Sequence, residues 1–475
     1  MPAELERLAR RWAGAHLPVY HRLPGPARHV AVSLRGWPLA RLRRSVWAED
    51  EARLGARLEV DPGEAAAVAR ARLRTMLVHA GATEPYWSRL FADVGFDPAS
   101  ADGPEALRRL PVLERETVRR EWPAFQSRAV ADGAAIFTST SGTTGTGLRV
   151  RATAEAYART WAQQVRQWRW AGVVPGDWRV TLFGAEVAPP RARRGLSAVN
   201  LPGRQILLSA HHLAARHAER YRRLLERRPL VVEGFPSVLG DLAALIGPAP
   251  RGRSRARVVF TTGEALLPAT RSRIAAAFGA PVFDHYGQDE KVGFILECSL
   301  GTYHQVTEYG VLEVVDDAGA PVAPGVVGHL VWTGLVNPAM PLVRYRIGDE
   351  GTLAPGGDAC CCGVRYPAVV PTLTRTGDSL RLSGGRRVSP RLLSRMLRDC
   401  RSVAAAQFVQ RAPDTVVIRV EPAAADAAAE ATRLARRLAG QLAGVRFEVE
   451  VVATLGREAS AKRRLVVVQE GADAA

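Results

Sequence analysis

The sequence predicts an α/β protein with a large N-terminal domain, containing mixed and parallel sheets and a β-rich subdomain, and a small C-terminal α+β domain. Three observations support this prediction. Helical periodicity dominates residues 1–130. Strand-like and helix-like segments then alternate until about residue 292, where the pattern becomes β-rich up to 375, and the alternation resumes over 376–475. We therefore expect a helical N-terminal part of the large domain, a ligand-binding core and a separate small domain over these ranges.

Composition places the chain among ordinary globular proteins. Its 475 residues suffice for two to four domains, and 47% hydrophobic with 24% charged residues is usual for a soluble protein. No apolar run approaches the length of a membrane span. Residues 1–12 include Glu4 and Glu6 and lack an apolar core, unlike a secretory signal. We expect a cytoplasmic protein without a membrane partner.

The charge balance raises the question of a polyanionic partner. A net charge of +18 is typical of nucleic-acid-binding proteins, but the arginines are spread evenly and accompany no nucleic-acid-binding motif. An anionic substrate explains the charge more simply, so no nucleic-acid partner is expected. Lys291 and Lys462 are the only lysines among 65 basic residues. Lysine differs from arginine in being a compact, mobile point charge, so these two positions are candidates for a required ammonium.

The N-terminal half begins with helices. Amphipathic spacing predicts helices at 64–80 and 113–122, and a further helix at 153–172. Trp161 and Trp168 lie seven residues apart on one face of the third helix, a spacing typical of a core stripe.

An α/β alternation follows. Strands are predicted at 178–183, 230–233, 257–260 and 282–283, with helices at 210–227 and 268–278. Strands separated by helix-length segments indicate a largely parallel sheet, which binds ligands at the carboxyl ends of its strands.

The remaining segments complete the two domains. In the β-rich stretch, strands are predicted at 311–315, 328–333 and 342–346. In the small domain, helices are predicted at 389–399 and 423–443, and strands at 404–409, 415–420 and 446–452.

One loop stands out for its composition. Residues 137–149 read F-T-S-T-S-G-T-T-G-T-G-L-R and follow an apolar, strand-like run. Glycines let backbone N–H groups converge and short hydroxyls add donors, which suits a polyphosphate. No Lys-Ser/Thr pair follows the last glycine, so this is not a Walker A loop; a flexible linker is the alternative. The candidate phosphate-binding residues are Thr140, Ser141, Gly142, Thr143, Thr144 and Gly145.

Two acidic motifs are candidates for nucleotide contacts. The run D-H-Y-G-Q-D-E follows a predicted strand, where Tyr286 beside Gly287 offers a stacking face and Glu290 could hold Mg²⁺. In R-Y-R-I-G-D, Asp349 follows a predicted turn and could accept two ribose hydroxyls. A solvated acidic turn that binds no ligand would give the same sequence patterns, so neither pattern alone shows a nucleotide contact.

The cysteines point to a metal. Cys298 with His304, and Cys360 with Cys362, could supply three thiolates and one imidazole to a closed, structural tetrahedral zinc site. The spacing leaves open which of three adjacent cysteines would bind, and unmetallated buried cysteines are the alternative. Cys400 reads as a core residue.

The motifs, taken in order, resemble those of the adenylate-forming superfamily, and most closely its phenylacetate–CoA ligase branch. The motifs that carry the resemblance are S-T-S-G-T-T-G, T-G-E at 262–264, H-Y-G-Q-D-E, R-Y-R-I-G-D, R-T-G-D-S-L at 375–380 and A-S-A-K-R-R-L at 459–465. The resemblance extends from about residue 130 to 470. It implies an ATP-dependent ligase that converts a carboxylic acid into acyl-AMP with release of pyrophosphate. The acyl group then passes to a thiol, most simply coenzyme A.

The resemblance also implies a role for each matching residue. The loop at 140–145 would hold the β- and γ-phosphates, Gly263 and Glu264 would line the adenine pocket, and Tyr286 would stack on the base. Glu290 would bind Mg²⁺, Asp349 would take the ribose hydroxyls, and Arg375 would reach the ribose or phosphate side. Asp378 would be the hinge of a mobile C-terminal lid, and Lys462 would bridge the substrate carboxylate and the α-phosphate. Many members of the branch show C-x5-H and C-x-C-G, which supports the zinc site with Cys361 outside it.

Several points stay open. Ala461, Gly147, Asp289 and Thr374 replace residues usual in the family, and Ala461 and Thr374 border the lid chemistry. Within the class, an amine or a carrier-protein thiol could replace coenzyme A as acceptor. Outside it, the alternative is a non-catalytic nucleotide-binding or nucleic-acid-binding protein. Homodimers occur in the branch, and the identity of the acid is not readable from the sequence.

Overall fold

The computed structural model describes residues 20, 22–139, 148–183, 187–188, 195–226, 230–355, 360–375, 380–382, 387–388, 393, 396–397, 400–442, 444–456 and 464–469. The chain forms two compact units, which are considered separately. The first unit is Met1–Asp177, Ala198–Ile206 and His285–Pro371, and the second is Trp178–Ser197, Leu207–Asp284 and Thr372–Ala475. Within the described part of the chain, no helix is both long and apolar enough to cross a membrane.

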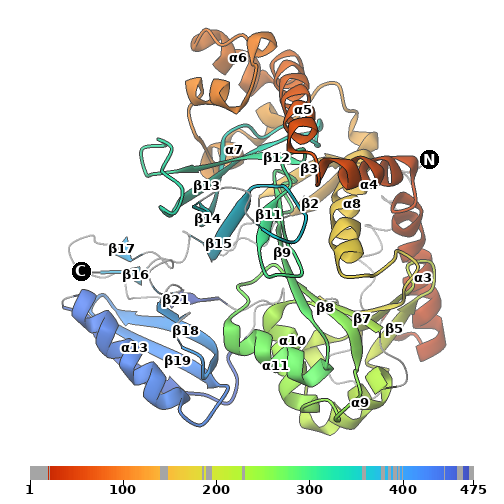
Figure 1. The fold of residues 1–475 in the computed structure, drawn as a ribbon, viewed down its shortest axis with the longest axis vertical. Coiled ribbons are helices and arrows are strands. Elements are labelled where there is room, and N and C mark those ends of the chain that lie inside the picture. The colour runs from red at the N-terminus through yellow and green to blue at the C-terminus, as the bar shows by residue number, and fades with distance from the viewer. Residues whose placement is uncertain are drawn as a thin grey trace. The chain divides into compact units, whose positions relative to one another are not determined.

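Helices form the N-terminal part of the first unit (Figure 1). Their starts follow local signals: Asp61 caps one helix by accepting the Glu64 N–H at 2.9 Å, and Thr153 caps another by accepting the Ala156 N–H at 3.1 Å. The helices predicted at 64–80 and 153–172 are confirmed. The helices are α3 (Gly25–Leu42), α4 (Val46–Leu58), α5 (Pro62–Thr83), α6 (Pro85–Asp93), α7 (Arg115–Arg120) and α8 (Ala154–Trp170).

The predicted stripe of core tryptophans is confirmed, whereas one predicted helix is wrong. Trp161 and Trp168 are both buried, and their rings make a T-shaped contact with centroids 4.9 Å apart. The single helix predicted at 113–122 is wrong. Its first two residues form strand β1 (Leu113–Glu114), because Leu113 pairs in parallel with Tyr345, and α7 begins only afterwards.

The β-rich part of the first unit is a mixed sheet in the order β12-β13-β14-β15-β11-β10-β9. A separate hairpin joins β2 (Ala135–Ser139) to β3 (Arg149–Thr153), so the predicted strand before the glycine-rich loop is confirmed. The sheet strands are β9 (Val282–Gly287), β10 (Phe294–Glu297), β11 (Tyr303–Gln305), β12 (Gly310–Val315), β13 (Gly328–Gly334), β14 (Tyr345–Leu353) and β15 (Ala368–Arg375).

Strand β14 differs from its predicted position. It begins at Tyr345 because Arg344 has a left-handed φ of 46°, and it continues to Leu353. Gly348, with φ 89°, lies where the register with β13 shifts between His329 and Val331. Asp349 therefore sits inside a strand beside a β-bulge, not after a turn as predicted. Bulges re-aim neighbouring side chains, which accounts for the placement of this carboxylate.

The second unit contains the parallel strands. Strands β4 (Arg179–Leu182), β7 (Leu230–Gly234) and β8 (Ala256–Thr262) pair in parallel, as predicted. Helix α11 (Pro268–Phe278) has the predicted bounds, since a proline starts it and Gly279, with φ 61°, ends it. Helix α10 (Pro236–Ile246) follows β7. Two short strands, β5 (Ser197–Asn200) and β6 (Gln205–Leu208), each have residues in both units.

One prediction in this region is wrong, and another gives a strand that is too short. The helix predicted at 210–227 is interrupted, because Ala214 is extended with φ −149°, and only α9 (Ala218–Glu226) is α-helical. The strand predicted at 282–283 continues through Gly287 as β9. Its second half pairs antiparallel with β10, so Tyr286 lies within the strand and not after it.

The C-terminal part has its own sheet and core. Strands β18 (Val403–Ala412), β19 (Thr415–Pro422), β20 (Arg446–Val451) and β21 (Val466–Val468) form a sheet in the order β20-β19-β18-β21. Helix α13 (Ala427–Gln441) lies against this sheet (Figure 1), and buried Phe408, Ile418 and Leu434 belong to their shared core. Two short strands, β16 (Leu380–Arg381) and β17 (Arg387–Val388), pair separately. A mixed α/β fold with a small C-terminal sheet is therefore confirmed.

Candidate functional site

Part of the predicted site lies outside the described residues. This applies to the phosphate-loop candidates Thr140, Ser141, Gly142, Thr143, Thr144 and Gly145, to Asp378 and to Lys462. Arg375 is described only as the last residue of β15. The two strands that flank the loop are paired up to Ser139 and Arg149, so its two ends lie next to each other in the hairpin.

The predicted adenine and ribose residues of the first unit are in direct contact. The Tyr286 hydroxyl donates to Asp349 Oδ2 at 2.7 Å, although the two residues lie 63 positions apart in the chain. Burial, together with the Asp349 charge, raises the pKa of Tyr286 well above its usual value, so the phenol stays protonated and keeps donating. The Tyr286 ring also stacks against Trp332, with centroids 6.3 Å apart and an interplanar angle of 19°.

Glu290, the predicted magnesium ligand, is buried in the same unit. Its Oε1 atom lies 3.7 Å from Arg115 Nη1 and accepts a long hydrogen bond of 3.5 Å from the Tyr345 hydroxyl. Burial and the nearby Glu290 charge raise the pKa of Tyr345 well above its usual value, so Tyr345 acts only as a donor here. These contacts orient the carboxylate. An ionised carboxylate is the ligand type that Mg²⁺ selects, so Glu290 fits that role.

Two glycines fix the turn that carries Glu290. Gly310 and Gly334 face each other across β12 and β13, and the backbone of Val292 approaches both. A Cβ atom on Gly310 would lie 1.9 Å from the Val292 carbonyl oxygen, closer than any real contact. Only glycine therefore permits this backbone approach.

This close approach leads to a stability prediction for Gly310→Ala. The added methyl group has to displace Val292 and the adjoining turn, so we expect a loss of about 1–3 kcal/mol in the free energy of unfolding. The contacts of Glu290 with Arg115 and Tyr345 should be disturbed as well, because Glu290 moves with the turn. Gly440→Ala is the matched control, since a methyl group added there would meet no neighbouring side chain within 4 Å. Equal behaviour of the two variants in urea unfolding would contradict the assigned role of Gly310.

In the second unit, Gly263 and Glu264, the predicted adenine-pocket residues, directly follow β8. Gly263 has φ 78°, which favours glycine. Glu264 Oε2 accepts the Ser237 N–H at 2.9 Å and so satisfies the N-terminus of α10. The strand end is further organised by Thr261, whose hydroxyl donates to buried Asp284 at 2.5 Å.

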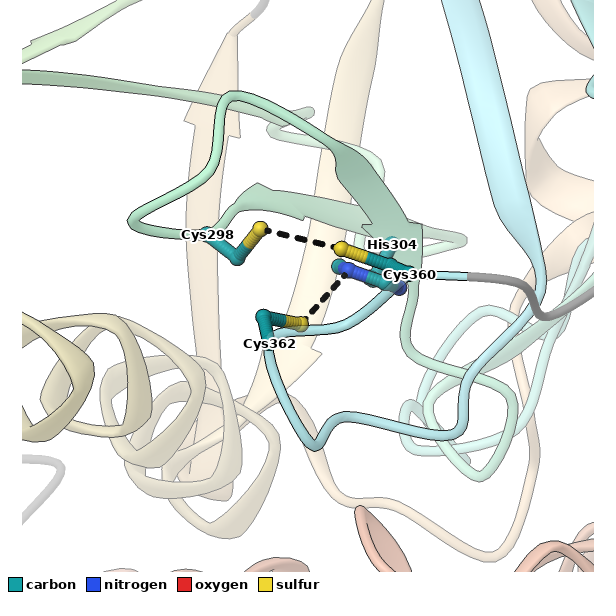
Figure 2. Close-up of side chains that lie close together, drawn as sticks. All are labelled: Cys298, His304, Cys360 and Cys362. Atoms are coloured by element: carbon teal, nitrogen blue, oxygen red, sulfur yellow. Dashed lines mark hydrogen bonds between the residues drawn. The ribbon is translucent and has the colours of Figure 1, made fainter.

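The four predicted zinc ligands lie together in the first unit (Figure 2). Their donor atoms all lie within 4.8 Å of one another. Cys298 Sγ is 3.8 Å from Cys360 Sγ, and Cys362 Sγ is 3.4 Å from His304 Nε2. A tetrahedron with Zn–S of about 2.3 Å and Zn–N of about 2.0 Å has edges of about 3.8 and 3.5 Å. The cluster therefore has the size of a zinc site.

The surroundings of the cluster also suit a metal. His304 Nδ1 donates to the Tyr366 carbonyl oxygen at 3.0 Å, which leaves Nε2 free to bind. Burial raises the pKa of Cys360, but hydrogen bonds from Thr302 and Cys362 outweigh it and lower this pKa to about 6. Burial raises the pKa of Cys362 to about 12. Cys361 is exposed and outside the cluster, and Cys400 is buried elsewhere, as predicted.

Sequence reasoning missed Arg115, Tyr345 and the glycine pair. Arg115 lies far upstream in α7, and nothing in its local sequence marks it as a neighbour of Glu290. Tyr345 belongs to the R-Y-R-I-G-D motif, but the motif alone gives it no role. Glycines inside strands are a recognised sign of close backbone approach, but Gly310 and Gly334 each lie one residue outside the strands predicted at 311–315 and 328–333, so this signal did not mark them.

Comparison with known proteins assigns the family. A family profile described as AMP-binding enzyme matches residues 68–337. Phenylacetate-coenzyme A ligase of Thermus thermophilus is 28% identical over 340 residues, which are 66% of this chain and 71% of the relative. The Escherichia coli protein of the same name is 26% identical over 306 residues, or 60% of this chain and 66% of the relative.

A solved structure supports the fold. 2-Hydroxyisobutyryl-CoA ligase in the postadenylation state, in complex with R3-HIB-AMP, superposes with a TM-score of 0.63. It is 21% identical in sequence, and the match covers 87% of this chain and 92% of that structure.

Proposed function

The chain belongs to the AMP-binding enzyme family, in the branch that resembles phenylacetate–CoA ligase, and on this premise we propose that it is an AMP-forming acid–thiol ligase. It activates a carboxylic acid as acyl-AMP with release of pyrophosphate. It then transfers the acyl group to the thiol of coenzyme A.

One observation carries most weight in this proposal. Tyr286, Glu290 and Asp349 come from two separate motifs, yet they belong to one compact unit in which Tyr286 donates to Asp349. The three side chains are buried and anchored by neighbours, so their positions are set before a ligand binds. A preorganised donor, base-stacking ring and carboxylate are what a nucleotide site requires.

The first half-reaction joins two anions. In our proposal the loop at 140–145 binds the β- and γ-phosphates, and Asp349 accepts the ribose hydroxyls. Lys462 neutralises the attacking carboxylate and the α-phosphate as they approach, a contact that strengthens in the transition state. Glu290 would hold Mg²⁺, which when bound offsets charge on the leaving pyrophosphate.

Before the second half-reaction, the contact that Lys462 makes in the first half-reaction has to be broken. The thiol must reach the acyl carbonyl from a direction that Lys462 would obstruct. We propose that residues 376–475 act as a lid that swings at Asp378 between the two half-reactions. Gating of this type is common where one site performs two consecutive steps.

Pyrophosphate release tests the function. The full chain is incubated with ATP, Mg²⁺ and a panel of aliphatic and aromatic acids, and pyrophosphate is measured with and without coenzyme A. We expect acid-dependent release and a thioester detected by mass spectrometry. Replacing coenzyme A with pantetheine or with simple amines separates the thiol acceptor from an amine acceptor. Acid-independent hydrolysis of ATP, or no release with any acid, would contradict the proposal.

We further propose that Cys298, His304, Cys360 and Cys362 hold a structural zinc ion. All four coordination positions would be filled by protein atoms, which leaves none for a substrate. When bound, the metal would join the β10–β11 hairpin to the segment at 360–362 and so stabilise the fold locally.

Zinc analysis of cysteine variants tests this site. We expect about one zinc per chain in the parent protein and loss of the metal in Cys298→Ser, since a hydroxyl is a poor zinc ligand. Cys361→Ser should keep the metal, because the exposed Cys361 thiol lies outside the cluster. Metal content would be measured by mass spectrometry after dialysis. Loss of zinc from Cys361→Ser, or a metal-free parent protein, would refute the assignment.

A further inference from the structure

Helix α3 carries an exposed apolar face that the proposed reaction does not use. The side chains of Val30, Leu34 and Trp37 are 58%, 70% and 47% exposed. They follow one another at spacings of four and three residues, so together with exposed Arg41 they lie within about 60° on the helix surface. Single exposed apolar residues are usual on a protein, whereas a row of them along one helix face indicates a contact surface.

A second segment of the first unit lies beside this face. Leu201, in the turn between β5 and β6, is 63% exposed, and its N–H donates to Ser33 Oγ at 3.1 Å. The Ser33 hydroxyl in turn donates to the Val199 carbonyl oxygen at 3.1 Å. Gly36 permits this close packing, because a Cβ there would lie 2.4 Å from the Asn200 side chain. The turn is thereby held against α3, and we call Val30, Leu34, Trp37 and Leu201 together the α3 face.

The charge around the α3 face has one sign. Residues 7–48 contain nine arginines and no Asp or Glu, which is half of the net charge of +18 of the whole chain. Exposed Arg41 continues the apolar row on α3, and Arg44 donates to the Pro202 carbonyl oxygen at 3.3 Å, in the turn that carries Leu201. Because the arginines are spread along the whole chain, the missing acidic residues create this local excess. An apolar face inside a positive stretch complements a surface that is both apolar and anionic.

We propose that the α3 face binds peripherally to membranes rich in anionic phospholipid. Helices with tryptophan and leucine on one face and arginines beside it lie in the boundary between lipid headgroups and acyl chains. The apolar side chains enter this boundary, and the arginines interact with the anionic headgroups. Peripheral binding needs no spanning helix, so the expectation of no membrane partner, which was drawn from the absence of a span, does not extend to it. The inference is independent of the proposed function.

Two other occupants match the α3 face less well. A second copy of the chain in a two-fold dimer would bring the same surface of both copies together, so the positive stretch would face itself. A nucleic acid would pair with the arginines through its phosphates, but these offer nothing to the aliphatic side chains. An anionic bilayer matches both the charge and the apolar side chains.

Vesicle flotation of the full chain tests the proposal. Vesicles of phosphatidylcholine alone are compared with vesicles of equal parts phosphatidylcholine and phosphatidylglycerol. We expect the chain to float with the anionic vesicles, and the partition coefficient to fall about tenfold in Leu34→Gln/Trp37→Gln, which removes two side chains that enter the bilayer boundary. Val174→Gln/Val326→Gln is the matched control and should bind as the parent does, since these side chains are 59% and 51% exposed but lie outside the stretch at 7–48.

Charge variants test the electrostatic part of the interaction. Arg41→Gln is expected to lower the partition coefficient about fivefold, the effect of removing one arginine close to an anionic surface. Arg53→Gln removes an equally exposed type of charge from α4, where Arg53 pairs with Asp50 at 3.1 Å outside the stretch. This control should change the partition coefficient little.

Four results would overturn the proposal. The first is a parent protein that does not float with anionic vesicles. The second is equal flotation of the parent and Leu34→Gln/Trp37→Gln, which would show attraction by net charge alone. In sedimentation velocity without lipid, a parent dimer that this double variant dissociates would assign the α3 face to a second copy. Retention on duplex DNA that the double variant loses would assign the face to a nucleic acid.

Discussion

Replacing Lys462 with alanine is expected to slow acyl-AMP formation by about a hundred- to a thousand-fold, the effect of removing one preorganised contact to developing charge. The substrate carboxylate and the α-phosphate repel each other as they approach. An ammonium between them lowers the barrier most where the two anions are closest, so the loss should appear in kcat more than in KM. The loss in kcat is measured as the rate of pyrophosphate release at saturating acid and ATP.

The variant should keep the second half-reaction. Acyl-AMP supplied to Lys462→Ala is expected to give acyl-CoA at close to the parental rate, because the proposal removes Lys462 from the site for that step. This result also shows that the variant is folded. Arg464→Ala removes a nearby charge and should affect neither step strongly. Accumulation of acyl-AMP at the parental rate in Lys462→Ala would show that the residue has a different role.

Arg166→Met is expected to destabilise the first unit by about 3–5 kcal/mol, the usual result of leaving a buried charge without its partner. Arg166 Nη2 lies 2.6 Å from Glu308 Oε1, and the two side chains are 2% and 0% exposed. Burial opposes the charged form of Arg166, but the Glu308 charge outweighs it and raises the arginine pKa. Tyr366 completes the group, donating to Glu308 at 3.0 Å and accepting from Arg166 at 3.1 Å.

The buried group of Arg166, Glu308 and Tyr366 also supports the predicted zinc site. Tyr366 also provides the carbonyl oxygen that orients His304, so the group connects α8 to the predicted zinc site. Gly55 makes room for the guanidinium, since a Cβ at this position would lie 1.7 Å from Arg166 Nη2. Loss of Arg166 is therefore expected to reduce zinc retention as well as stability.

Urea unfolding followed by tryptophan fluorescence measures the effect. Arg53→Met is the control: Arg53 is 71% exposed and pairs with Asp50 at 3.1 Å, so its loss should cost no more than about 1 kcal/mol. The double variant Arg166→Met/Glu308→Gln should be more stable than Arg166→Met, because no unpaired charge remains buried. Equal stability of Arg166→Met and Arg53→Met would contradict the assigned role of the ion pair.

The features that were predicted from the sequence depend on local signals. Helix α11 lies at its predicted bounds because a proline begins it and a glycine ends it. Strands β7 and β8 are short apolar runs beside helices, a pattern that specifies a buried parallel strand. The cysteine and histidine pairs were predicted from chemistry, since three thiols and an imidazole share few other uses, and they do lie together.

The features that could not be predicted depend on pairing between distant segments. The bulge at Gly348 exists only because β14 is in register with β13, and that register decides where Asp349 points. The contact of Arg115 with Glu290 joins residues 175 positions apart. The contact of Lys291 Nζ with the Tyr157 ring of α8 joins distant segments, and no periodicity near Lys291 indicates it. The single helix predicted at 113–122 was wrong for the same reason, because pairing with β14 extends Leu113 and Glu114.

The fate of the carboxylate oxygen tests the central claim most directly. An acid that supports turnover is labelled with ¹⁸O in its carboxylate and converted with ATP, Mg²⁺ and coenzyme A, and the nucleotide and phosphate products are analysed by mass spectrometry. If the carboxylate attacks the α-phosphorus and the thiol later expels AMP, one labelled oxygen must appear in AMP and none in inorganic phosphate. Label in inorganic phosphate, with ADP as the nucleotide product, would contradict formation of an acyl-adenylate.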